Sequence, residues 1–122
     1  MSFAKWVFRI AGIYGLLVLL PFYFVENNPL AIPLPAITHP EYYYGFIGVG
    51  LAWQVAFLII STDPVKYRLL MIPTFIEKFS FAIAVAFLYS SGRVGPYILP
   101  GAAIDTLLGI LFIFSYLKNR KA

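Results

Sequence analysis

The stretch LLMIPTFIEKFSFAIAVAFLY, residues 69–89, decides the fold class of this 122-residue chain. It is long enough to cross the ~30 Å hydrocarbon core of a bilayer as one α-helix, which takes ~20 apolar residues. Comparable stretches lie at residues 6–25, 43–61 and 97–117. Because the second and third connections are short, the sequence predicts an all-α integral membrane four-helix bundle with up-down-up-down topology.

The composition supports a single transmembrane domain over residues 1–122. Apolar residues make up 61% of the chain and charged residues 11%, against ~45–50% and ~25% in soluble domains. A soluble fold of this composition would lack polar side chains to cover its surface, whereas a bilayer removes that demand. Cysteine is absent, which excludes disulfides and thiolate metal sites.

The basic residues predict an orientation, because cytoplasmic loops collect Lys and Arg. One side of the predicted bundle carries Lys5, Arg9, Lys66, Arg68, Lys118, Arg120 and Lys121, and the other carries Arg93. Both termini are therefore predicted to be cytoplasmic. The net charge of +4 is explained by this flanking pattern, so nucleic acid is not an expected partner. The small size and bare loops favour a bacterial inner (plasma) membrane.

Prolines mark the connections and the spans. Residues 26–40 form the longest predicted loop and contain four prolines, which make it stiff and extended. This outer loop either folds over the mouth of the bundle or along the interface, or is a plain connector. Pro21 and Pro100 lie inside predicted spans, where a kink is expected.

Three polar residues fall near the middle of the predicted bilayer. At ~1.5 Å per residue, Glu77 lies roughly 13 Å above the inner edge of its helix, and Asp105 roughly 12 Å below the outer edge. Gln54 comes out roughly 16 Å below the outer edge by the same rise. Glycines at positions 101 and 109 share a face with Asp105, and small residues mark close helix contact in lipid. We therefore expect a shared polar site inside the bundle, composed of Gln54, Trp53, Glu77, Lys78, Asp105 and Thr74.

Energetics require these acids to be compensated. A carboxylate at a helix centre costs at least ~2.5–3.5 kcal/mol, so Lys78 and Arg9 neutralise the acids, or the acids carry protons. Glu77 and Lys78 are adjacent and point about 100° apart on a helix, so they are not expected to face each other. Lys78 then serves Asp105 or a lipid headgroup, or leans toward the cytoplasm.

Several functions fit this pattern. The first is a pocket that binds a lipophilic small molecule or lipid, or an accessory subunit in a homo-oligomer or larger membrane complex. The second is an enzyme with Glu77 and Asp105 as an acid/base pair, and the third is a proton-coupled transporter. A purely structural polar clamp between helices is the alternative to all three. No cofactor motif is present, and no metal site is expected, because His39 is the single histidine and zinc takes three or four ligands.

The layout resembles two groups of small four-helix membrane proteins. Glu77-Lys78-Phe79-Ser80-Phe81-Ala82-Ile83-Ala84 resembles the DoxX-like family, in which an acidic residue opens an apolar half-helix. An outer proline-containing segment followed by an aromatic-rich helix with Trp53-Gln54 resembles the emopamil-binding, sterol-isomerase and sigma-2-receptor group. The second resemblance would imply a cavity for a sterol-like or amine-bearing ligand near Glu77 and Asp105.

Overall fold

The computed structural model describes residues 2–24 and 38–119, and within these ranges it contains helices and turns but no strand. The four long helices are α1 (Phe3–Leu19), α2 (Pro40–Thr62), α3 (Met71–Ser90) and α4 (Leu99–Lys118). Short 3₁₀ segments follow α1 (Leu20–Phe24) and precede α3 (Arg68–Leu70) and α4 (Pro96–Ile98). Together with these segments, all four helices are long and apolar enough to cross a membrane. The all-α prediction is confirmed, and the predicted outer loop falls mainly outside the described residues.

Local sequence explains where the helices begin. The Ser2 hydroxyl accepts a hydrogen bond from the Lys5 backbone N–H at 3.4 Å and so caps α1. Pro40 and Pro100 occupy the first turns of α2 and α4, where a helix needs no N–H from them. The predicted kink at Pro100 is therefore wrong. Pro21 lies in the 3₁₀ segment that ends the first span.

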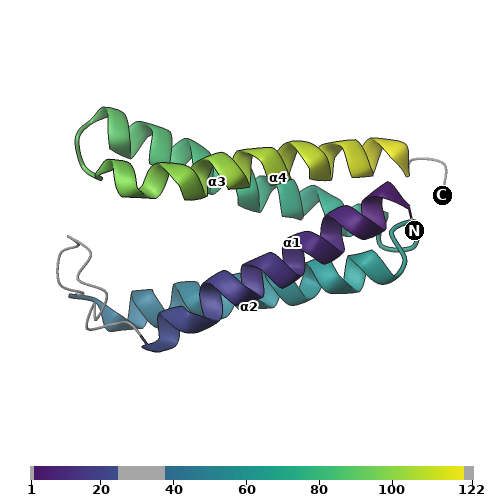
Figure 1. Cartoon of the computed structure of the whole chain (residues 1–122), viewed down its shortest axis with the longest axis horizontal. Coiled ribbons are helices and arrows are strands. Elements are labelled where there is room, and N and C mark those ends of the chain that lie inside the picture. Colours follow the sequence, from purple (N-terminus) through teal and green to yellow (C-terminus); the bar gives the residue numbers. More distant parts are fainter. Residues whose placement is uncertain (1, 25–37, 120–122) are drawn as a thin grey trace.

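The helices form two hairpins, α1 with α2 and α3 with α4 (Figure 1). Phe3 and Lys118 lie at the same end, with the Lys118 ammonium 4.7 Å from the Phe3 ring centroid. We call this end, together with the α2–α3 connection, the terminal end. The opposite end carries the start of α2 and the α3–α4 turn, where Gly92 adopts a φ of 76° that favours glycine.

Small residues bring α1 and α2 close together. A Cβ at Gly12 would lie 2.8 Å from the Leu58 side chain, and a Cβ at Gly15 would overlap the side chain of Gln54. Without a hydrophobic driving force between helices in lipid, such close backbone packing is a main source of association. The first hairpin is therefore a tight unit.

The second hairpin uses one glycine in the same way. A Cβ at Gly109 of α4 would lie 2.8 Å from the Phe79 ring of α3. Gly101, which was expected to share this contact face, has nothing within 4 Å of its would-be Cβ. Of these two glycines, only Gly109, which follows Asp105, therefore lies at a close contact between α3 and α4.

An aromatic cluster of Phe8, Phe57 and Phe112 joins the two hairpins in the half nearer the terminal end. The Phe8 and Phe112 rings stack with centroids 4.3 Å apart, and Phe57 meets Phe112 edge-on at 5.0 Å. All three side chains are fully buried. Because α1, α2 and α4 each supply one ring, this cluster is the main apolar contact across the hairpins.

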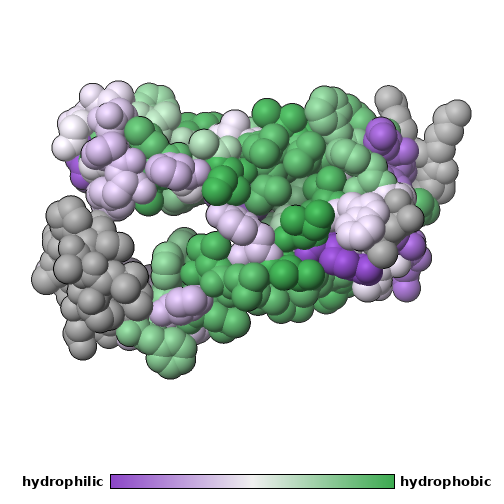
Figure 2. Space-filling view, in the orientation of Figure 1, coloured by the Kyte–Doolittle hydropathy of each residue, from purple (hydrophilic) through white to green (hydrophobic). Residues whose placement is uncertain are grey.

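The hairpins part toward the opposite end. In Figure 1, α2 and α3 diverge as they leave the terminal end, and Figure 2 shows open space between the two layers in the same place. The terminal end is closed not only by the aromatic cluster but also by Arg68. Its Nε donates to the Tyr116 carbonyl at 2.9 Å, and its guanidinium lies 3.8 Å from the Tyr116 ring centroid.

Candidate ligand cleft between α2 and α3

A cleft of about 660 Å³ lies where α2 and α3 diverge. Its α2 wall follows one helix face, because its residues recur every three or four positions. Its α3 wall is a single turn. The lining residues are Glu41, Tyr42, Gly45, Phe46, Val49, Gly50 and Trp53 from α2, and Glu77, Ser80 and Phe81 from α3.

A charged triad of Glu77, Lys78 and Asp105 lies at the base of the cleft. The Lys78 Nζ is 3.4 Å from Asp105 Oδ1 and 3.6 Å from Glu77 Oε2. Its side chain is only 7% exposed, against 27% for Glu77 and 19% for Asp105. The two acids on α3 and α4 therefore do share one level, and Asp105 points at the neighbouring helix, as predicted.

The expectation that Glu77 and Lys78 do not meet is wrong. The direction of a Cα–Cβ bond does not fix the position of an ammonium at the end of a flexible four-carbon stem. Lys78 turns inward and is buried, and of its predicted roles it takes the one beside Asp105. Its Nζ also lies 5.2 Å from the Phe57 ring centroid of α2, which is within range of a cation–π contact.

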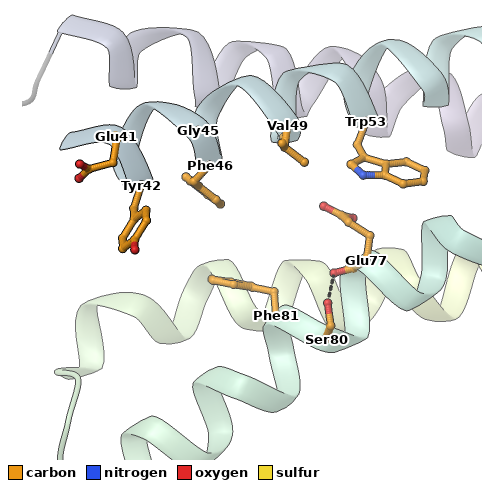
Figure 3. A pocket seen from close by; sticks show the side chains of 10 residues that line it. Glu41, Tyr42, Gly45, Phe46, Val49, Trp53, Glu77, Ser80 and Phe81 are labelled. Carbon is orange, nitrogen blue, oxygen red and sulfur yellow. Dashed lines mark hydrogen bonds between the residues drawn. The ribbon is translucent and has the colours of Figure 1, made fainter. Parts of the chain in front are cut away.

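Glu77 is the member of the triad that lines the cleft. Figure 3 shows its carboxyl group directed across the cleft toward the α2 wall near Val49 and Trp53. Glu77 Oε2 is buried and has no hydrogen-bond partner among the described residues. This Oε2 is the oxygen that faces the Lys78 ammonium at 3.6 Å, which is longer than a hydrogen bond, so the carboxyl group can still accept a hydrogen bond from a group bound in the cleft.

The remaining predicted site residues are placed differently. Trp53 lines the cleft. Gln54 is buried against Gly15 of α1, and its Nε2 donates to the Gly50 carbonyl at 2.9 Å. Thr74 is fully buried, and its hydroxyl donates to the Met71 carbonyl at 2.5 Å. Neither Gln54 nor Thr74 is among the residues that line the cleft.

Sequence reasoning missed the apolar walls. Phe46, Val49 and Phe81 line the cleft but carry no chemical signal of their own. Their spacing is informative, because Val49 and Phe46 precede Trp53 by four and seven positions and so lie on the same helix face. That pattern marks the α2 wall once Trp53 is assigned to the site.

Metal ligands do not gather within the described ranges, where no group of three or more His, Asp or Glu side chains lies close enough to hold an ion. His39 is exposed at the start of α2, and its Nδ1 lies 3.8 Å from Glu41 Oε1. This pair at the mouth of the cleft supplies two ligands at most.

We compared the chain with protein-family models, curated proteins and solved structures, and none matches it. The resemblance to the DoxX-like and emopamil-binding groups therefore stays a prediction.

Proposed function

We propose that this chain is an integral membrane protein that binds a lipophilic small molecule or lipid in the cleft between α2 and α3. The observation that carries the proposal is the combination of apolar walls with a half-buried acid, Glu77, at the base. Ligand sites are typically concave spaces of ~300–1,000 Å³ with apolar linings and few polar groups. The volume and lining of this cleft match that description.

The membrane topology that fits is up-down-up-down with cytoplasmic termini. Lys5, Lys66 and Lys118 belong to the terminal end, and Arg93 follows α3 at the opposite end. This asymmetry follows the positive-inside rule. In that orientation the cleft opens in the outer half of the bilayer. The small size and short connections favour a bacterial inner membrane.

A polar clamp alone explains less of the geometry. The Lys78–Asp105 contact joins α3 to α4 and suits a clamp. Glu77 is not needed for that joint, yet it brings a second carboxyl group to the same ammonium and presents it to the cleft. An acid is costly at this depth, so its place at the base of an apolar cleft favours ligand binding.

The acid/base enzyme is less well supported by the same geometry. Both carboxyl groups would have to reach one substrate atom within hydrogen-bond distance or through one water. Asp105 faces Lys78 and is not among the cleft-lining residues. Binding therefore remains the better account, with Glu77 as the ligand-facing acid and Asp105 as the residue that positions Lys78.

Filling the cleft tests this proposal. Val49→Trp places a bulky ring on the α2 wall, whereas Ile83→Trp makes a similar change at an exposed α3 position that does not line the cleft. We expect native mass spectrometry to detect a co-purifying lipophile on the unmodified protein and on Ile83→Trp. Its affinity should fall at least ~10-fold in Val49→Trp, equivalent to ~1.4 kcal/mol.

Two outcomes would reject the proposal. One is a protein that binds no lipophile saturably when lipid extracts are titrated into it. The other is an equal loss of affinity in Val49→Trp and Ile83→Trp, because the cleft would then have no special part in binding.

A further inference from the structure

The cleft is long in one direction. Its α2 wall runs from Glu41 to Trp53, which is ~18 Å at ~1.5 Å per residue. One leaflet's share of the hydrocarbon core is ~15 Å. The α3 wall covers only the turn from Glu77 to Phe81. The space therefore has the length of a lipid chain and is open along much of its other side.

One glycine opens the α2 wall of this space. Gly45 and Gly50 both line the cleft, but a Cβ built on Gly45 would meet nothing within 4 Å, whereas a Cβ built on Gly50 would lie 2.9 Å from the Leu19 side chain of α1. No side chain therefore interrupts the cleft at Gly45, between the flanking Tyr42 and Phe46. A flexible chain can lie in this gap and follow the helix, whereas a rigid fused-ring body requires a broader space of fixed shape.

The carboxyl group at the base of the cleft indicates which polar group the ligand carries. The Glu77 carboxyl group lines the cleft, and its buried Oε2 is held to Lys78 by an ion pair of 3.6 Å rather than by a hydrogen bond. When ionised, this carboxyl group accepts but does not donate. Lys78 already lies within 3.6 Å of two carboxyl groups. A hydroxyl group would donate to Glu77 and satisfy it, whereas a carboxylate end would place a third acid beside the triad.

We propose that the ligand is a long-chain or isoprenoid alcohol, with its chain extended along the α2 wall past Gly45 and its hydroxyl group donating to Glu77. This inference rests on the proposed function and narrows it to one chemical class. The alcohol enters from the outer leaflet, and its hydroxyl end lies deepest in the cleft.

A tryptophan of the protein itself can report binding through its fluorescence. The chain contains two tryptophans, Trp6 and Trp53, of which Trp53 lines the cleft and Trp6 lies on α1 near the terminal end. Trp6→Phe therefore leaves Trp53 as a single fluorophore beside Glu77. The probe is a long-chain alcohol brominated close to its hydroxyl group, titrated into lipid nanodiscs that hold this variant, because bromine quenches tryptophan on contact.

The expected result is saturable quenching by the brominated alcohol, with a half-saturating mole fraction at least ~10-fold below that of a brominated sterol. A ~10-fold difference corresponds to ~1.4 kcal/mol. In the same background, Gly45→Leu should raise the half-saturating fraction at least ~10-fold. Gly101→Leu is the matched control, since Gly101 is also an exposed helical glycine with open space around it but lies outside the cleft.

Other outcomes separate this inference from the proposed function. If the sterol quenches saturably at an equal or lower half-saturating mole fraction, the ligand is not a long-chain alcohol, but the cleft still binds a lipophile. Equal quenching by the corresponding brominated fatty acid would overturn the role of the hydroxyl group, and this arm needs no cleft variant to fold. If neither the alcohol, the acid nor the sterol saturates, both the inference and the proposed function fail.

Discussion

Replacement of Lys78 by methionine is expected to cost about 3–5 kcal/mol of folding free energy, because removing one partner of a buried ion pair leaves the other charges uncompensated. Here two carboxyl groups, Glu77 and Asp105, would remain around an apolar side chain of similar length. Equilibrium unfolding in detergent micelles measures the loss. Lys66→Met is the control, because Lys66 is exposed in the connection between α2 and α3.

The double variant Lys78→Met/Asp105→Asn tests the reason for this loss. Removing one acid together with the ammonium reduces the uncompensated charge, so the double variant should be more stable than Lys78→Met alone. A Lys78→Met protein as stable as Lys66→Met would contradict the charged triad. So would a double variant in which the two losses simply add.

Replacement of Phe112 by alanine is the second large effect, expected at about 3 kcal/mol, near the low end of the ~3–5 kcal/mol range for buried Phe→Ala changes. Phe112 packs on Phe8 and Phe57 and is fully buried. In lipid the loss comes from packing rather than from hydrophobic transfer, which places it at the low end. Thermal unfolding of the purified variant in detergent measures it.

Phe114→Ala is the matched control for this cluster. Phe114 lies on the same helix, two positions along, and is 52% exposed on the surface. Its removal should change stability by a small fraction of the Phe112→Ala effect. If both variants lose the same stability, then the aromatic cluster is not what joins the two hairpins.

The sequence predicted the four helices well, because length and apolar composition are sufficient to recognise a spanning helix. The observed helices begin at other residues than the predicted ones, because local preferences decide the start of a helix. Ser2 caps α1, and Pro40 and Pro100 lie in the first turns of α2 and α4. A kink at Pro100 was predicted because Pro100 lies inside the apolar stretch of residues 97–117, but the helix α4 itself begins only at Leu99.

The shared level of Glu77 and Asp105 was predictable, since helical rise converts sequence position into height in the bundle. Depth does not decide which neighbour a side chain faces. Gln54 lies at a suitable height but packs on Gly15, a contact that only the α1–α2 arrangement decides. Lys78 contacts Glu77, which was not expected, because its flexible side chain can reach several of the groups around it.

The cleft itself was not predictable from composition. It exists because tight glycine contacts hold each hairpin together while the aromatic cluster joins the hairpins near one end only. Gly12, Gly15 and Gly109 are readable in the sequence as small residues, but which helix each one meets depends on the assembled bundle. The opening between α2 and α3 is the consequence of these separate contacts.

A crystal structure determined in a lipidic mesophase tests the central claim most directly, because it images the cleft within lipid. The account predicts that Phe46 and Phe81 remain apart and that elongated density lies along α2, with one end at the Glu77 carboxyl group. It is contradicted if α2 and α3 pack against each other along their whole lengths, or if Glu77 turns away from Lys78 toward the surrounding acyl chains.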